Sequence, residues 1–429
     1  MTAIVGILNK RSVALAADSA ITIDGPNGHK VLNSANKLFN ISRRHPVGLM
    51  MYSSATFMDT PWELIIKTYR DYLKYKCFPT LQEYVDDFIK YLKEKHFFCS
   101  SDLQKCFLLR HMIFYYEDVL KIAIKNCVDR TGESPDKIPL AIAHEEMLKV
   151  LSEHTSNFSK YPKSPDFKDY TLESFRLLAE YATKEIESKY AAHVRNIEEF
   201  RDAFLESFFT YLCSNHIVFD HTGLVFVGYG NDEIYPSLIP LNVAFAIDGK
   251  LRYSIDVANA QHISEKTKAA ICPFAQTDVM MTILTGIDRG IQELTYNTLD
   301  STIANLLKTI LANLLAQGVD QTVIHSLTSN VDPQIFIGYF KKTINDYITH
   351  EYIKKLVETV EYLDKEDLAN VAENLISLTG LKRRMTSSEE SVGGPVDVAL
   401  ISKCDGFIWM KRKHYFKRDL NEQFFQRYK

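Results

Sequence analysis

The feature that most constrains the fold of this chain is the wide separation of its strand-forming segments. Short apolar runs typical of β-strands occur in three groups, at residues 3–52, 224–255 and 396–411. Helical patterns fill both intervals between these groups, and each interval is longer than a hundred residues. Strands from different groups must still meet if they are to bury their apolar faces. The order of segments therefore predicts a layered α+β core that carries helical insertions.

Individual strands are predicted from apolar runs that are bounded by turn residues. We expect strands at residues 3–9, 12–17, 37–41, 47–52, 224–230, 238–247, 251–255, 396–401 and 406–411. The first two form a predicted hairpin. The polar, Gly-containing stretch from Asp24 to His29 is predicted to be a loop, so that the first fifty residues form a β-meander.

The first helical block is predicted from its capping residues and from its lack of glycine. Thr60–Glu63 and Thr80–Glu83 both have the capping-box pattern, in which a threonine and a glutamate three residues later satisfy N–H groups at a helix start. The chain then stays helix-like over residues 97–216, with a Pro-rich break at 161–165.

A second helical block is predicted over residues 276–382. Its clearest helix has leucine and isoleucine residues at alternating spacings of three and one between residues 303 and 315. Asp300 or Ser301 is the expected N-terminal cap, and Gly318 is the expected end.

Charge and cysteine content exclude several classes of protein. The 50 basic and 54 acidic residues give a net charge of −4 without blocks of either sign, whereas proteins that bind nucleic acid through phosphates are usually basic. No apolar run reaches the roughly 18 residues that a membrane span needs. The first positive charges follow the apolar run instead of preceding it, unlike a signal peptide. The seven cysteines never occur as CxxC. We therefore expect a cytoplasmic protein that binds neither nucleic acid nor membrane and has no disulfide framework.

Thr2 is the most specific chemical candidate in the sequence. Removal of Met1, which a small second residue permits, would leave a threonine that carries both a hydroxyl and a free α-amine. Such a residue contains its own nucleophile and general base, because an α-amine with a pKa of about 8 can accept the hydroxyl proton near neutral pH.

Two charged residues strengthen this hypothesis. Asp18 ends the second predicted strand, and Lys37 opens the third. Adjacent antiparallel strands can bring these two positions and the start of the first strand to one edge of a sheet. There a lysine would favour the alkoxide form of the Thr2 hydroxyl, and a buried aspartate would hold the lysine in place.

Several segments of the chain resemble proteasome β-type and HslV-type peptidases, which are N-terminal-nucleophile hydrolases. The matching segments are TAIVG at 2–6, VALAADS at 13–19, NKLFNI at 36–41, GLMMYSS at 48–54, VFVGYGND at 225–232 and VGGPVDVALI at 392–401. The resemblance covers roughly residues 2–95, 217–290 and 362–412. It implies a four-layer αββα sandwich with helical insertions.

The resemblance also implies a catalytic set. Thr2, Asp18 and Lys37 occupy the positions of the family's catalytic threonine, aspartate and lysine. Ser53 occupies the position whose backbone N–H forms the oxyanion hole, although the family has glycine there.

The family's supporting residues map less clearly. Its supporting aspartate and serine fall near residues 389–392, where Glu389 or Glu390 replaces the aspartate and Ser391 lies one position out of register. A central supporting serine should lie within Gln276–Asp278, and the sequence does not choose among these three residues.

The domain organisation implied by the resemblance alternates core and insertion. The expected core segments are residues 1–96, 217–291 and 362–429, and the expected helical insertions are residues 97–216 and 292–361.

The implied function is that of a threonine-type endopeptidase that acts on polypeptides without a metal or organic cofactor. Family relatives assemble into rings, so we expect a homo-oligomer, and an ATP-driven unfoldase is a conceivable partner. Two alternatives remain open. The chain could be a catalytically inactive assembly subunit, or it could hydrolyse a small amide that is not a peptide.

Three further patterns are better explained without a catalytic role. Gly228–Gly230 lacks the third glycine of a dinucleotide-binding loop, so a turn is expected. His144–Met147 lacks the second histidine of a metalloprotease helix. Lys382–Arg384 is a short basic cluster, for which we expect a solvated helix end.

Overall fold

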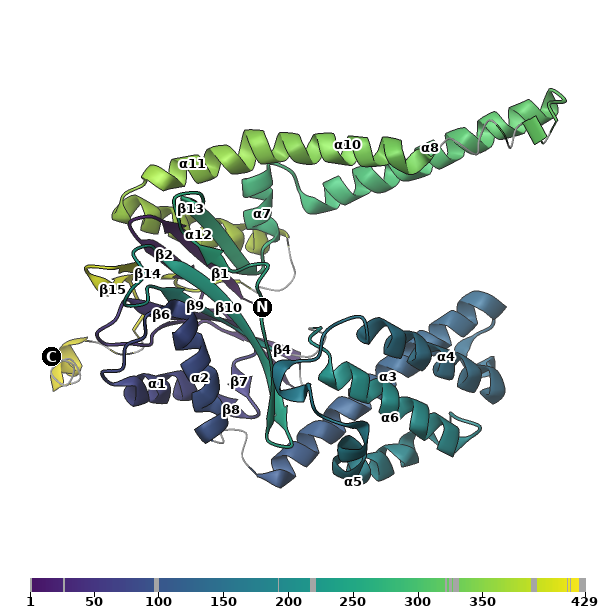
Figure 1. Cartoon of the computed structure of the whole chain (residues 1–429), viewed down its shortest axis with the longest axis horizontal. Coiled ribbons are helices and arrows are strands. Elements are labelled where there is room, and N and C mark those ends of the chain that lie inside the picture. The colour runs from purple at the N-terminus through teal and green to yellow at the C-terminus, as the bar shows by residue number, and fades with distance from the viewer. Residues whose placement is uncertain are drawn as a thin grey trace. The chain divides into compact units, whose positions relative to one another are not determined.

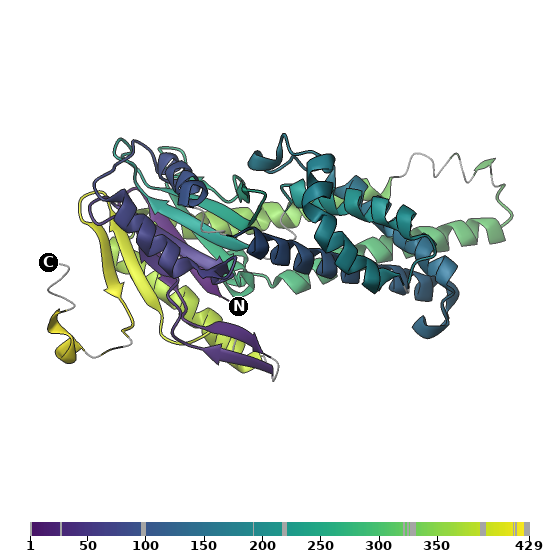
Figure 2. The same cartoon turned by 90° about the horizontal axis from the view of Figure 1, so that it is seen from below.

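The computed structural model (Figures 1 and 2) divides into two compact units that both contain helices and antiparallel sheet, which confirms the predicted α+β class. The described residues are 2–25, 28–95, 100–191, 193–216, 221–320, 322–323, 326, 332–386, 392–414, 416 and 418–423. The first unit comprises Met1–Leu38, Ile234–Ser237 and Gln261–Lys429. The second unit comprises Phe39–Glu233 and Leu238–Ala260.

The sheet of the first unit has the strand order β13-β1-β2-β14-β15. Its strands are β1 (Ala3–Asn9), β2 (Val13–Ala17), β13 (Ala269–Ala275), β14 (Asp397–Ser402) and β15 (Gly406–Lys411). The predicted hairpins β1–β2 and β14–β15 are both present. Strand β13 was not predicted, because Pro273 interrupts its pattern. Proline is tolerated there because β13 is an edge strand and pairs on one side only.

Between β13 and β14 the chain forms the helices of this unit. They are α7 (Asp278–Thr285), α8 (Arg289–Ala316), α10 (Pro333–Ile348), α11 (Lys354–Tyr362) and α12 (Lys365–Thr386), with a π-helical turn at Thr349–Ile353. Buried apolar residues of α12, among them Leu368 and Ile376, share one core cluster with Val5 of β1 and Ala14 of β2. This core holds the start of β1 and the end of β2 in fixed positions.

Helix α8 begins earlier than the sequence predicted. Its N-terminal cap is Asp288, whose carboxylate accepts hydrogen bonds from Gly290 and Ile291. The prediction of Asp300 or Ser301 as the cap was wrong, because the apolar spacing that marked the helix starts a few turns inside it. Asp300 instead pairs with Lys341 of α10, which runs alongside α8 (Figure 1).

The sheet of the second unit has the strand order β11-β10-β9-β6-β5. Its strands are β5 (Leu38–Asn40), β6 (Val47–Ser53), β9 (Thr222–Gly228), β10 (Ser237–Ile247) and β11 (Lys250–Ile255), and short β12 (Gln261–His262) pairs with β10. The predicted N-terminal meander was therefore wrong, because β5 and β6 belong to a different sheet from β1 and β2.

The segment predicted as a polar loop contains a hairpin of its own, formed by β3 (Ile21–Gly25) and β4 (Gly28–Leu32). The alternation of Ile21 and Ile23 with polar residues is a strand pattern, which the nearby glycines and proline obscured. This hairpin separates β2 from β5 in the sequence. Strand β5, the third predicted strand, can therefore pair in the sheet of the second unit.

The helices of the second unit are α1 (Trp62–Leu73), α2 (Leu81–Lys95), α3 (Ser101–Thr131), α4 (Leu140–Phe158), α5 (Leu172–Tyr190) and α6 (Ile197–Cys213). Helices α3 to α6 lie side by side (Figures 1 and 2). One continuous core joins them to the sheet, from Met112 of α3 and Phe204 of α6 to Phe88 of α2 and Phe226 of β9.

The second predicted capping box contributes the expected threonine cap. Thr80 accepts a hydrogen bond from the Glu83 N–H at the start of α2. Thr60 instead pairs with Phe57 in a two-residue ladder formed by β7 (Thr56–Phe57) and β8 (Thr60–Pro61), and α1 begins at Trp62 without a side-chain cap. Among the described residues, no helix combines the length and apolarity that crossing a membrane requires.

Candidate functional site

Asp18 and Lys37 form a buried ion pair in the first unit. The Lys37 ammonium donates to Asp18 Oδ1 at 2.7 Å and to the Ala20 carbonyl oxygen at 2.6 Å. The Lys37 side chain is 4% exposed and the Asp18 side chain 1% exposed. The predicted association of these two residues is therefore confirmed.

The same carboxylate oxygen also binds the backbone at the start of β1. The Ala3 N–H donates to Asp18 Oδ1 at 2.9 Å. Because the Lys37 ammonium donates to this oxygen as well, the ammonium lies less than about 6 Å from the nitrogen of the Thr2–Ala3 peptide. Within the described residues, no hydrogen bond joins Lys37 to the Thr2 hydroxyl directly. The Asp18–Lys37 pair thus lies beside the Thr2–Ala3 peptide at the start of β1. The predicted direct contact between the Lys37 ammonium and the Thr2 hydroxyl is absent from the described hydrogen bonds.

Thr2 itself is held by the neighbouring edge strand. Its carbonyl oxygen accepts a hydrogen bond of 3.0 Å from the Gln276 N–H, and the residue is 7% exposed. The position of the Thr2 backbone is therefore fixed from both sides, by Gln276 and by the Asp18 contact of Ala3.

The second oxygen of Asp18 is equally engaged. Asp18 Oδ2 accepts from the N–H groups of Ala20 at 3.1 Å and Gly393 at 3.3 Å. Gly393 belongs to the glycine pair that precedes β14, and Gly394 has a φ of +74°, which favours glycine. Four donors thus converge on one buried carboxylate, and the sequence alone did not indicate the contribution of Gly393.

The electrostatics of the site centre on Lys37. Burial lowers the pKa of the Lys37 ammonium, the negative charge and hydrogen bond of Asp18 oppose that shift, and the positive charge of Lys413 adds to it. A buried lysine with a lowered pKa gives up its proton more readily than a solvated one.

Lys413 belongs to a second, partly buried pair that sequence reasoning missed. Its ammonium and backbone N–H both bind the carboxylate of Asp397, which is paired in register with Ala17, the residue before Asp18. Asp397 was visible in the sequence only as part of the segment VGGPVDVALI, and nothing in that segment points to Lys413.

The remaining predicted site residues are not brought into this cluster by the described contacts. Ser53 belongs to the second unit, at the end of β6, where it is exposed and has a φ of +71°. This left-handed conformation is uncommon for a residue other than glycine. Glu389, Glu390 and Ser391 lie outside the described residues.

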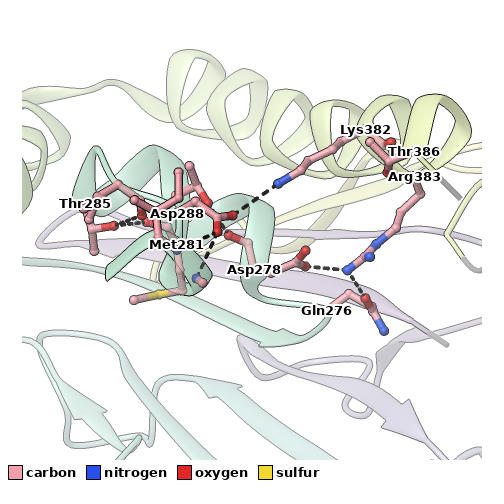
Figure 3. Close-up of polar contacts among 12 residues, drawn as sticks. Gln276, Asp278, Met281, Thr285, Asp288, Lys382, Arg383 and Thr386 are labelled. Atoms are coloured by element: carbon pink, nitrogen blue, oxygen red, sulfur yellow. Dashed lines mark hydrogen bonds and ion pairs between the residues drawn. The ribbon is translucent and has the colours of Figure 1, made fainter. Parts of the chain in front are cut away.

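The segment Gln276–Asp278 is connected to α12 by Arg383 (Figure 3). The Arg383 guanidinium donates to the side-chain oxygen of Gln276 and, at 2.6 Å, to Asp278. Lys382 lies 3.7 Å from Asp288. The expected solvated helix end is therefore correct for Lys382 and Arg384, which stay partly or fully exposed at the end of α12, but not for Arg383, which binds amide and acidic groups beside α7. Arg383 holds the residue whose backbone binds Thr2.

The described residues contain no group of three or more His, Cys, Asp and Glu side chains that could hold a metal ion. His144, the one histidine of the metalloprotease-like segment, lies 3.6 Å from Glu199 of α6.

Comparison with known proteins adds no assignment to this geometry. No protein-family model matches the chain, and the search of curated proteins found no match either.

Proposed function

We propose that this protein is an amide hydrolase of the N-terminal-nucleophile type, in which Thr2 is the nucleophile. The proposal requires a chain that begins at Thr2, so that the α-amine of this residue is free. Its expected substrates are polypeptides, as the resemblance to proteasome-type peptidases implies.

The observation that carries the proposal is the sharing of Asp18 Oδ1 by two donors. One is the N–H of Ala3, which is directly bonded to Thr2, and the other is the ammonium of Lys37. A cation is thereby held beside the first peptide of β1 in a region screened from water. There its effect on a developing negative charge is larger than at the surface.

The chemistry then proceeds in two stages. The Thr2 hydroxyl oxygen attacks the substrate carbonyl carbon, and the α-amine of Thr2 takes the hydroxyl proton. The amine passes that proton to the leaving nitrogen as the amide bond breaks, which leaves an ester on Thr2. Water then attacks the ester, and the hydroxyl of Thr2 is restored. Lys37 favours the alkoxide by its charge, and Asp18 fixes the position of Lys37.

The proposal includes the finer features of the resemblance. These are a four-layer αββα arrangement of the two sheets, a backbone donor at Ser53, supporting roles for Glu389 and Ser391, and assembly of several copies. In support of the layered arrangement, each sheet has helices packed on it, α12 on the first and α2 on the second.

The experiment compares hydrolysis of peptide and small-amide substrates by the chain that begins at Thr2 with hydrolysis by its Thr2→Ala and Thr2→Ser variants. We expect Thr2→Ala to abolish hydrolysis and Thr2→Ser to retain part of it, because serine keeps both the hydroxyl and the amine. Intact mass after rapid quenching should show an acyl group on Thr2. Equal hydrolysis by the Thr2→Ala variant would contradict the proposal.

A further inference from the structure

A pocket of about 330 Å³ lies within the second unit, beside the end of β6. It is lined by Ser54, Thr56, Met58, Asp59, Phe107, Arg110, His111, Phe114, His221, Thr222 and Ala244. Its volume is at the lower end of the range for small-molecule sites. The pocket therefore has room for one small molecule and not for an extended polymer.

The backbone beside this pocket is strained. Among the described residues, six that are not glycine have a positive φ, and three of them are Ser53, Met58 and Asp59. Such conformations cost about 1–3 kcal/mol each and concentrate at ligand sites. Met58 and Asp59 line the pocket directly, and Ser53 precedes Ser54, which also lines it. The strain is therefore concentrated at the wall formed by the β6–β8 segment.

Two opposite charges line the pocket without pairing with each other. Across the described part of the chain, neither Arg110 nor Asp59 has an ion pair or a hydrogen bond through its side chain. The Arg110 guanidinium lies 5.0 Å from the centre of the Phe107 ring, a contact that orients it. Both side chains are exposed, so a ligand can reach them.

The third polar group is the imidazole of His111, which is uncharged at neutral pH. Burial, together with the positive charges of Arg110 and Arg252, lowers the pKa of His111 to about 4. At neutral pH the side chains of Arg110, Asp59 and His111 therefore offer a cation, an anion and an uncharged imidazole.

The rest of the wall is mixed, with Ser54, Thr56, His221 and Thr222 beside the apolar side chains of Met58, Phe107, Phe114 and Ala244. Phe107 and Phe114 lie about two turns apart on α3, and the Phe114 side chain is 58% exposed although it lines a concave site. Met58 adds a flexible thioether side chain to the same pocket. These groups suit an apolar side chain of moderate size.

We propose that this pocket binds a free amino acid with an apolar side chain, whose carboxylate pairs with Arg110 and whose ammonium pairs with Asp59. A guanidinium is the preferred partner of a carboxylate. A ligand with only one charge would leave the opposite charge of the pocket without a partner. This binding site is independent of the proposed hydrolysis.

The experiment measures binding of three probes by ligand-detected NMR titration of the full chain. The probes are L-phenylalanine, 3-phenylpropanoate, which lacks the amine, and 2-phenylethylamine, which lacks the carboxylate. We expect L-phenylalanine to bind about tenfold more tightly than either single-charge probe, because one charged hydrogen-bonded contact is lost in each of them.

Two variants assign each charge to its residue. Arg110→Gln should weaken L-phenylalanine and 3-phenylpropanoate about tenfold and leave 2-phenylethylamine unchanged. Asp59→Asn should weaken L-phenylalanine and 2-phenylethylamine and leave 3-phenylpropanoate unchanged. Asparagine tolerates the left-handed backbone at this position, so the fold is expected to persist. Lys121→Gln and Asp129→Asn, both on α3 and outside the pocket, are the matched controls and should change nothing.

Three results would overturn the proposal. The first is the absence of saturable L-phenylalanine binding in the wild-type chain. The second is binding that is insensitive to both pocket variants. The third is tighter binding of the dipeptide glycyl-L-phenylalanine than of L-phenylalanine, because that result would assign the pocket to peptides instead of free amino acids.

Discussion

Asp18 is the residue on which the candidate site depends, because its two oxygens receive four donors from separate parts of the first unit. The donors are the N–H groups of Ala3, Ala20 and Gly393 and the ammonium of Lys37. A buried carboxylate is stable only when it is paired and hydrogen-bonded in this way. The charge of Lys37 is therefore coupled to the positions of the first strand and of the glycine pair before β14.

Replacing Lys37 tests this coupling. Lys37→Met should lower amide hydrolysis at least about a hundredfold, because the cation beside Thr2 is lost. It should also destabilise the fold by about 3–5 kcal/mol, since it leaves the buried Asp18 charge without its partner. Chemical denaturation measures the second effect. Lys411→Met is the control, because it breaks an exposed ion pair with Glu373, leaves the Asp18–Lys37 pair in place and should cost at most about 1 kcal/mol.

An unchanged free energy of unfolding in Lys37→Met would contradict the buried pair. Unchanged hydrolysis in a folded Lys37→Met variant would contradict the catalytic role alone, so the two claims fail separately.

His111 predicts a specific pH dependence of stability. The pKa of this residue is about 4 in the folded chain against an ordinary value of 6.5. Between these pH values the unfolded chain binds the proton and the folded chain does not, so stability falls as the pH is lowered from 6.5 to 4. The full loss is roughly 3 kcal/mol. The difference between wild type and His111→Gln, measured by denaturant titration across this range, isolates the contribution. Parallel pH profiles would contradict it.

At the scale of elements, the N-terminal cap of α8 shows where a sequence pattern misleads. The helix begins at Arg289, and Asp288 accepts two backbone hydrogen bonds there. Asp288→Ala should therefore increase hydrogen exchange in the first turn of α8 about fivefold, which corresponds to a cap contribution of about 1 kcal/mol.

Ser301→Ala is the matched control for the cap, because Ser301 was an equally good candidate from the sequence and lies inside the helix. It should leave exchange in the first turn unchanged. The opposite ranking of the two variants would show that the helix starts where the apolar spacing begins.

The elements also show what the sequence could predict. The nine expected strands occur within one or two residues of their predicted ends, because their apolar runs are bounded by clear turn residues. The β3–β4 hairpin and β13 were missed, since glycine and proline obscured the first and Pro273 the second. Strand partners beyond the two hairpins β1–β2 and β14–β15 could not be derived, because β2 and β5 are consecutive in the prediction and belong to different sheets.

The strand arrangement from which the meeting of Asp18 and Lys37 was predicted is only partly correct. Asp18 and Lys37 do meet beside the start of β1. However, the strand that follows Lys37 is not adjacent to β2, as the prediction assumed, because the β3–β4 hairpin lies between these two strands in the sequence. The contribution of Gly393 depends on a contact across 375 residues and that of Arg383 on one across 107, which local patterns do not contain. Lys413 contacts Asp397 from the far side of the β14–β15 hairpin, and no local pattern marks that contact either.

At the scale of the whole molecule, the second unit is expected to unfold as one body, because its helices and sheet share one core. Within this unit, Arg252 of β11 connects the sheet to the end of α6. Its guanidinium donates to the carbonyl oxygens of Leu212, Ser214 and His216, at the end of α6 and just beyond it, and the residue is 5% exposed.

Arg252→Met should destabilise the second unit by about 2–4 kcal/mol, because two buried carbonyls and one partly buried carbonyl lose a charged donor. Hydrogen exchange should show equal losses of protection in α6 and β11. Arg176→Met, which breaks an exposed ion pair with Asp202, should cost at most about 1 kcal/mol. Loss of protection confined to α6 would show that the helices form a separate cooperative unit.

The central claim is that the α-amine of Thr2 is the general base of the reaction. The most direct measurement compares hydrolysis by the chain that begins at Thr2 with hydrolysis by the same chain carrying an additional residue or tag before Thr2. Every side chain is then identical, and only the amine differs. We predict hydrolysis, together with labelling of Thr2 by an electrophile that adds to both a hydroxyl and its neighbouring amine, only in the chain that begins at Thr2. Equal hydrolysis by the blocked chain would contradict this account.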